Sequence, residues 1–504
     1  MNKPLVRRAA VVALAACSML AAGGATSAQE KNAVAADQAA QKVAATICTS
    51  CHGPSGISTS PLFPRLAGQQ ELYLAAQLRA FKGRTRGEQD AHDYMNDSAR
   101  NPGPALVFNP LSPDFIRDPY PFYRQLREHD PMHRTPLGIY LASRSAEVTS
   151  VLRDKRFGKD YVGRTTKRYG PAILEEPIFR SMHHWMLLRD PPDHTRLRGL
   201  VVKAFTAPRV EGMRPRIQQI VDESLDRVAG RGQMDLVADY AFRLPVVVIC
   251  DMLGIPEEDR EVFFARERTA GRLLDPVPLT RAEIDAANAS HLASVAYFQR
   301  LFDLRRREPA DDLTTHLVQA EEHGNQLSNE ELVANIILLF GAGHETTVNL
   351  IGNGLLALHR NADQLALLKA RPELIGNAVE EFLRYDSSVQ LTGRVALEDI
   401  DDVGGKKIFN GESVLCLLGS ANRDPAAYPD RPDSLDITRP NNRPHSFGGG
   451  IHFCLGAQLA RIEAEVAIST LLRRLPDLRL DDAVHPEWRP TFVLRGLMRL
   501  PARW

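Results

Sequence analysis

The feature that most constrains the fold of this chain is the glycine-rich segment Phe447–Gly456, which holds one cysteine, Cys454, directly before a predicted helix. Glycines let the backbone turn sharply and approach another group closely. Gly456 is expected to open a helix over Ala457–Arg474, with its N-terminus directed at the sulfur. Backbone amides around a thiol favour the thiolate, which is the form that binds metals. The segment therefore places a cysteine at a helix N-terminus, where a thiolate would be stabilised.

A glycine-rich loop before a helix can instead hold a phosphate group. Neither the Lys-Ser/Thr ending of a P-loop nor the glycine spacing of a dinucleotide-binding turn occurs in Phe447–Gly456. The formal net charge of the 504 residues is zero. This argues against a nucleic-acid partner, because the phosphates of nucleic acids bind to basic protein surfaces. The phosphate-binding interpretation of the loop is therefore disfavoured.

A second unusual feature is a polar, glycine-containing patch, Ala342–Thr347, inside an apolar helix predicted to start at a capping box, Ser328 to Glu331. The patch contains an adjacent acid and alcohol, Glu345 and Thr346. A glycine inside a helix costs about 1 kcal/mol relative to alanine, and such local conflicts are typical of functional sites. On these residues alone, the other interpretation is a kinked helix with a solvated glutamate.

Together these segments resemble the cytochrome P450 superfamily, the haem-thiolate monooxygenases, in its soluble bacterial form. Phe447–Gly456 matches the family's haem loop, F-x-x-G-x-(R/H)-x-C-x-G, at every defined position. Glu381–Arg384 matches the E-x-x-R motif, and Arg439 supplies the third member of that structural network. The motifs agree in order and spacing over about residues 105–504. The resemblance implies a mainly α fold, rich in helices and with small β-sheets.

The resemblance also implies a set of site residues. Cys454 would be the thiolate ligand of a haem b iron, and Glu345 and Thr346 would deliver the protons that break the O–O bond. The expected haem-loop and propionate contacts are Phe447, Gly448, Gly450, His194, Arg198, Arg394 and His452. Beside the haem loop, the kinked-helix interpretation of the polar patch is disfavoured.

The activity implied is the insertion of one oxygen atom of O2 into a small apolar organic substrate, by hydroxylation or epoxidation. By analogy the pocket walls come from residues 160–185, 335–342, Val389–Thr392 and Thr491–Leu494. The chain has no cysteine cluster for an iron–sulfur centre and no dinucleotide fingerprint for a reductase. We therefore expect an external ferredoxin or similar redox partner.

The start of the chain has the pattern of an export signal over residues 1–28. Basic residues precede an apolar stretch, Ala9–Ala22, and small residues precede Gln29. Leu14–Cys17 also resembles a lipoprotein-processing box. The apolar stretch is short for a membrane span. These residues predict a periplasmic protein, and the resemblance to soluble bacterial P450s leaves the cytoplasm as the alternative.

Cys48, Cys51 and His52 form the C-x-x-C-H pattern of covalent haem c attachment. Two thiols one helical turn apart can bond both vinyl groups, and the histidine next along is then aimed at the iron. A redox dithiol would not need the histidine, and no second cysteine pair completes a zinc site. Residues 48–87 resemble a small class I bacterial cytochrome c, with Met95 as the sixth iron ligand by position.

This cytochrome c-like module is incomplete. It spans residues 31–100 and lacks the C-terminal helix of its class, and His92 is a rival iron ligand. A helix-hostile linker over residues 101–105 leads to the P450 domain, 106–504. The alternatives to a monooxygenase with an accessory haem c are a two-haem electron-transfer or haem-sensing fusion without turnover, and an artefactual gene fusion.

Overall fold

The computed structural model describes residues 110, 112–135, 138–260, 270–322, 325–481 and 485–504. The predicted signal peptide, linker and cytochrome c-like module lie outside the described residues. The same holds for the proposed haem c residues Cys48, Cys51, His52 and Met95. The residues from Pro113 to Trp504 form one compact unit.

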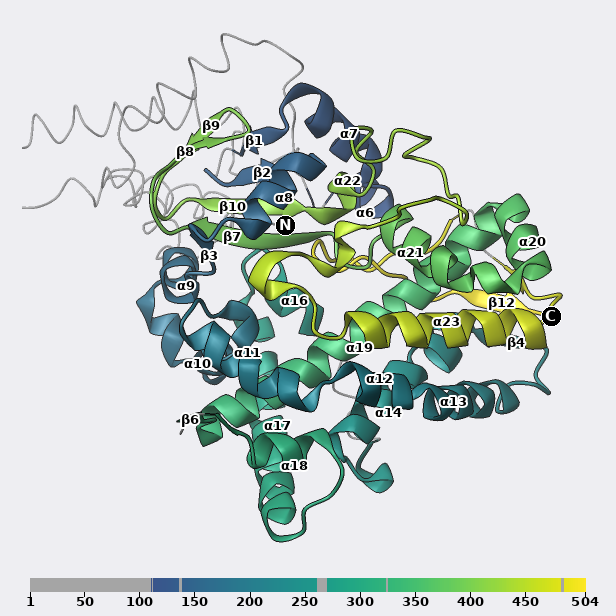
Figure 1. The fold of residues 1–504 in the computed structure, drawn as a ribbon, viewed down its shortest axis with the longest axis horizontal. Helices are drawn as coiled ribbons and strands as arrows, with labels where there is room; N and C mark the ends of the chain where they lie inside the picture. Colours follow the sequence, from purple (N-terminus) through teal and green to yellow (C-terminus); the bar gives the residue numbers. More distant parts are fainter. Residues whose placement is uncertain (1–109, 111, 136–137, 261–269, 323–324, 482–484) are drawn as a thin grey trace, which may run out of the picture. The chain divides into compact units, whose positions relative to one another are not determined.

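Helices dominate this unit, as the resemblance implied (Figure 1). The helices before residue 260 are α6 (Pro113–Arg117), α7 (Tyr120–His129), α8 (Ser145–Arg153), α9 (Tyr161–Tyr169), α10 (Pro177–Met182), α11 (Asp193–Ala204), α12 (Ala207–Gly212), α13 (Arg214–Asp226) and α14 (Arg243–Leu253). The later helices are α16 (Ala270–Leu274), α17 (Arg281–Arg307), α18 (Leu313–Val318), α19 (Asn329–Arg360), α20 (Ala362–Ala370), α21 (Ile375–Tyr385), α22 (Leu418–Ala421) and α23 (Ala457–Arg474).

The strands form small sheets, and the largest has five strands in the order β1-β2-β10-β7-β3. Its members are β1 (Met132–Arg134), β2 (Tyr140–Ala142), β3 (Phe157–Gly158), β7 (Leu391–Ala396) and β10 (Ser413–Leu417). β7 pairs antiparallel with both neighbours, and Gly158 of β3 lies opposite Val395 of β7. This register brings the residues that follow β3 close to the middle of β7.

The remaining strands are short. A three-stranded sheet has the order β11-β12-β4, and two hairpins pair β5 with β6 and β8 with β9. Their bounds are β4 (Gln233–Asp235), β5 (Glu321–Glu322), β6 (Asn325–Gln326), β8 (Ile400–Val403), β9 (Lys406–Ile408), β11 (Arg479–Leu480) and β12 (Pro501–Arg503).

The long helix α19 begins at the predicted capping box, with both reciprocal hydrogen bonds between Ser328 and Glu331. It continues without interruption through the polar patch. Within the patch, the hydroxyl of Thr346 donates to the carbonyl of Ala342 at 3.0 Å. Glu345 is buried, with 7% of its surface exposed. The buried side chain of Glu345 contradicts the solvated glutamate of the alternative interpretation.

Two apolar cores meet along α19. Its first half, from Leu332 to Phe340, packs in a core with residues of α10, α17 and α18. Its second half, from Val348 to Leu358, packs in another core with residues of α13, α21 and α23. Helix α14 contributes residues to both cores. Among the described helices, none is both long and apolar enough to cross a membrane.

Candidate functional site

The glycine-rich loop precedes α23, whose bounds match the predicted helix Ala457–Arg474. The amide of Cys454 donates to the carbonyl of Phe447 at 3.0 Å and closes the loop on itself. Gly448 and Gly450 have φ angles of +70° and +65°, in the region that favours glycine. A Cβ on Gly450 would also lie 2.1 Å from the carbonyl oxygen of Leu152. The loop therefore requires these glycines to present Cys454.

The Cys454 thiol is exposed at its surface. The protein around it nevertheless raises its pKa, because burial disfavours the thiolate. The amide of Gly456 and the cations Arg198 and Arg461 lower the pKa, but the effect of burial is larger. The amide of Gly456 thus acts in the expected direction, but burial outweighs it. A bound metal ion deprotonates a coordinating thiol outright. In this loop, metal binding rather than the surrounding protein would therefore ionise the thiol.

Four basic side chains gather beside this loop, and we call them the cationic cluster: His194 and Arg198 of α11, Arg394 of β7, and His452. The rings of His194 and His452 lie 4.2 Å apart, centroid to centroid. The guanidinium of Arg198 donates to the carbonyl of Phe453 at 2.6 Å. The structure thus brings together the propionate partners predicted from three separate parts of the chain.

The cationic cluster lacks a matching anion among the described residues. Both ring nitrogens of His194 and Nε2 of His452 are buried without a hydrogen-bond partner there. Burial, followed by the charge of Arg198, lowers the pKa of His194 to about 4. The guanidinium of Arg394 is buried, and among the described residues it donates only to Thr392 and to the carbonyl of its neighbour Gly393. Unsatisfied donors beside buried cations suit carboxylates, so these residues fit the propionates of a haem.

The acid and alcohol of the polar patch lie on α19, which packs against α23. Glu345 is buried, and its Oε1 lies 3.9 Å from Nη1 of Arg489. Thr346 is half-buried on the adjacent position. Sequence reasoning did not anticipate Arg489, which lies 144 positions further along the chain than Glu345 (489 − 345).

Two of the four predicted pocket walls, Val389–Thr392 and Thr491–Leu494, are linked to each other. Val389 forms a β-bridge with Leu494, and the amide of Gln390 donates to the carbonyl of Val493 at 2.8 Å. The buried carboxylate of Asp275 accepts the amide of Val493 at 2.9 Å and that of Phe492 at 3.2 Å. No sequence pattern indicated this role of Asp275, which depends on a contact between distant segments.

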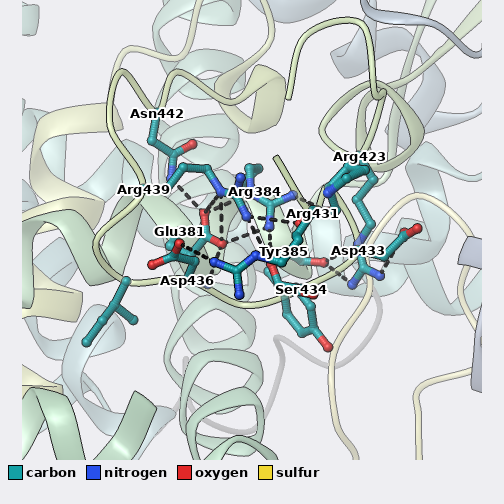
Figure 2. A network of polar contacts seen from close by, with 12 residues as sticks. Glu381, Arg384, Tyr385, Arg423, Arg431, Asp433, Ser434, Asp436, Arg439 and Asn442 are labelled. Carbon is teal, nitrogen blue, oxygen red and sulfur yellow. Dashed lines mark hydrogen bonds and ion pairs between the residues drawn. The ribbon is translucent and has the colours of Figure 1, made fainter. Parts of the chain in front are cut away.

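The E-x-x-R motif forms a buried network with Arg439, as predicted (Figure 2). The two carboxylate oxygens of Glu381 each accept a hydrogen bond from Arg384 at 2.8 Å. Arg439 donates to the same oxygens at 3.2 and 3.3 Å, and Asn442 donates at 2.9 Å. The amide of Asp436 adds a further bond at 2.8 Å. We call Glu381, Arg384, Arg439 and Asn442 the glutamate network.

Backbone carbonyls complete the glutamate network. Arg384 is fully buried. It donates to the carbonyls of Asn422 at 3.1 Å, Pro432 at 2.6 Å and Ser434 at 2.8 Å. The E-x-x-R spacing predicted the ion pair, whereas Asn442 and the carbonyl partners carried no sequence signal.

Comparisons with known proteins agree with this geometry. The family profile described as Cytochrome P450 matches residues 288–373 and 364–487. The chain is 44% identical over 401 residues to Cytochrome P450 107B1 of Saccharopolyspora erythraea, covering 77% of this chain and 96% of that protein. It is 43% identical over 412 residues to Cytochrome P450 monooxygenase PikC of Streptomyces venezuelae, covering 80% and 94%.

The fold is similar to solved structures as well. The crystal structure of P450BioI in complex with hexadec-9Z-enoic acid ligated acyl carrier protein aligns with a TM-score of 0.72 and 39% identity. The alignment covers 78% of this chain and 99% of that one. The matching family implies a haem b held by a cysteine thiolate. The chain belongs to the cytochrome P450 family and is a monooxygenase of that family.

Proposed function

We propose that Cys454 is the thiolate ligand of the haem b iron, and that Phe447, Gly448 and Gly450 shape the loop that carries it. The observation that carries this proposal is the gathering of the cationic cluster, without a matching anion, beside the Cys454 loop. When bound, the haem supplies oxygen activation, and thiolate ligation favours O–O cleavage.

In this proposal the cationic cluster holds the haem propionates. His194 and His452 supply ring nitrogens that are otherwise unsatisfied. Arg198 and Arg394 supply charge-assisted donors, which suit carboxylates in particular. The glutamate network supports the segment before the haem loop and takes no part in the reaction.

Glu345 and Thr346 hold and pass the protons that oxygen cleavage consumes. The Thr346 hydroxyl, now bonded to the Ala342 carbonyl, supplies a donor on the surface of α19. Buried Glu345 supplies the exchangeable proton behind it. Thr346→Ala is expected to release hydrogen peroxide in place of product, measured as peroxide formed per NADPH consumed. Unchanged coupling would remove Thr346 from this role.

The proposed reaction inserts one oxygen atom of O2 into a small apolar organic substrate. Its pocket is lined by residues 160–185, 335–342, Val389–Thr392 and Thr491–Leu494, and its electrons come from a separate ferredoxin and reductase. The bonds between Gln390 and Val493 support this assignment, because they hold two of these segments together. The solved P450BioI structure is a complex with hexadec-9Z-enoic acid ligated acyl carrier protein, so hexadec-9Z-enoic acid is a suitable first probe in a spin-state titration.

For the N-terminal module we propose a covalent haem c on Cys48 and Cys51, with His52 and Met95 as axial ligands and a periplasmic location. The C-x-x-C-H pattern after an export signal supports this. We place haem c outside the electron route, because His/Met ligation raises a potential and thiolate ligation lowers it. The intact mass of the purified product tests whether both parts occur in one chain.

The proposal is tested by the reduced-plus-CO spectrum, read together with a pyridine haemochrome. The wild type is expected to show the thiolate-specific absorbance, and Cys454→Ala is expected to lose it. Cys48→Ala is expected to lose only the covalent haem signal. A folded, haem-loaded protein without the thiolate-specific absorbance would contradict the assignment of Cys454.

A further inference from the structure

Lys159 is a buried lysine directly after β3, with 4% of its surface exposed. The register of β3 on β7 places it beside Arg394, a member of the cationic cluster. Its ammonium donates to the carbonyl of Gly393 at 3.1 Å, and the guanidinium of Arg394 donates to the same carbonyl at 2.9 Å. Two buried cations therefore converge on one neutral acceptor.

Asp190 is the carboxylate that acts on the charge of Lys159. Its oxygens already accept hydrogen bonds from backbone amides. Asp190 accepts the amide of Lys159 at 2.8 Å and the amide of Asp160 at 3.0 Å. Among the residues that the structure describes, no carboxylate forms an ion pair with the Lys159 ammonium. A buried charge without a partner is costly, so this arrangement calls for an anion from outside the chain.

The charge of Lys159 acts on the cationic cluster. It contributes to lowering the pKa of His194, although burial is the main cause and the charge of Arg198 comes next. Burial, together with the charges of Arg394 and Arg164, in turn lowers the pKa of Lys159 itself. Lys159 and the cationic cluster therefore share one electrostatic environment, which an anionic ligand would relieve.

We propose that Lys159 is a further partner of the haem propionates. It adds to the cationic cluster a positive charge that lies outside the family motifs found in the sequence. Its role is to position the cofactor and to offset the propionate charge, and the monooxygenase assignment does not depend on it.

The test is Lys159→Gln in the full-length, haem-loaded protein. Glutamine keeps an amide that can donate to the Gly393 carbonyl and removes only the charge. Haem transfer to excess apomyoglobin is expected to become about tenfold to hundredfold faster, the usual range for losing a buried hydrogen bond to a charged group. The haem midpoint potential is expected to become more negative, because a nearby positive charge favours electron uptake.

Lys407→Gln is the matched control, since Lys407 is an exposed lysine paired with Asp401 at 2.9 Å. This variant is expected to leave both the rate of haem transfer and the haem midpoint potential unchanged. The thiolate-specific CO absorbance should persist in Lys159→Gln, which separates this test from the one on Cys454. If Lys159→Gln transfers haem to apomyoglobin at the wild-type rate and keeps the wild-type midpoint potential, the proposal is overturned.

Lys159→Arg is the second variant and keeps the charge. It is expected to retain the wild-type potential. If Lys159→Gln does not accumulate as folded protein, Lys159→Arg decides the question alone. A potential in Lys159→Arg that falls clearly below that of the wild type would overturn the proposal.

Discussion

The glutamate network pairs its two buried arginines with the Glu381 carboxylate, whereas no carboxylate among the described residues forms an ion pair with the cationic cluster. Every hydrogen-bonding site on the Glu381 carboxylate meets a donor from the chain (Figure 2). The cationic cluster holds ring nitrogens without any partner among the described residues. A network in which opposite charges are paired serves the fold, whereas a group of basic side chains without a carboxylate marks the place of an anionic ligand.

The largest effect on stability is expected from breaking the glutamate network. Arg384→Met leaves the Glu381 carboxylate buried without its main partner, which typically costs about 3–5 kcal/mol. We expect this loss in the free energy of unfolding, measured by urea denaturation of the haem-loaded protein. A loss below about 1 kcal/mol would show that the network is no more important than a surface pair.

A substitution in the cationic cluster should change haem affinity rather than the free energy of unfolding. Arg394→Met removes a donor that the chain itself leaves without an anion, so the effect should fall on the cofactor. We expect haem affinity to drop by about 2 kcal/mol, the usual value for a hydrogen bond to a charged group, measured by haem transfer to apomyoglobin. Equal haem transfer in Arg394→Met and the wild type would contradict the comparison.

Asp275 lies between these two cases, because its buried carboxylate has partners in the chain but no close ion pair. It accepts hydrogen bonds from two backbone amides, and Arg272 lies 3.8 Å away. Burial raises its pKa above the ordinary value of 3.8. The folded state therefore holds this proton to higher pH than the unfolded state, and stability falls as pH rises through the folded pKa. Asp275→Asn should remove this dependence, an effect on the order of 1 kcal/mol.

The measurement for Asp275→Asn is urea denaturation of variant and wild type at a series of pH values from 4 upward, so that the two curves can be compared. The variant's stability relative to the wild type should increase with pH. A constant difference would show that the Asp275 carboxylate does not titrate within that range.

The smallest effect is expected at Glu380, one position before the glutamate network. Glu380 pairs with Arg461, and both side chains remain partly exposed, at 21% and 32%. Solvent screens such pairs, so Glu380→Gln should cost less than about 1 kcal/mol. Because it lies on the same helix as Arg384, it is the matched control for Arg384→Met in the same denaturation assay.

Local pattern predicted part of this molecule well. The capping box at Ser328 and the helix bounds Ala457–Arg474 depend on neighbouring residues, and the structure has both. The effect of the Gly456 amide on the Cys454 thiol follows from the sequence, whereas the larger effect of burial depends on segments that meet only in the fold. Lys159 and Asp275 were missed for a related reason, since each acts through segments that meet only in the fold.

Helix α19 belongs to both apolar cores, with 32 residues in one uninterrupted helix. The two cores therefore cannot loosen independently without straining this helix, which couples their unfolding into one cooperative event. Glu345 and Thr346 lie between its two core-packed halves. Amide hydrogen exchange at these positions should therefore follow the joint unfolding of the two cores.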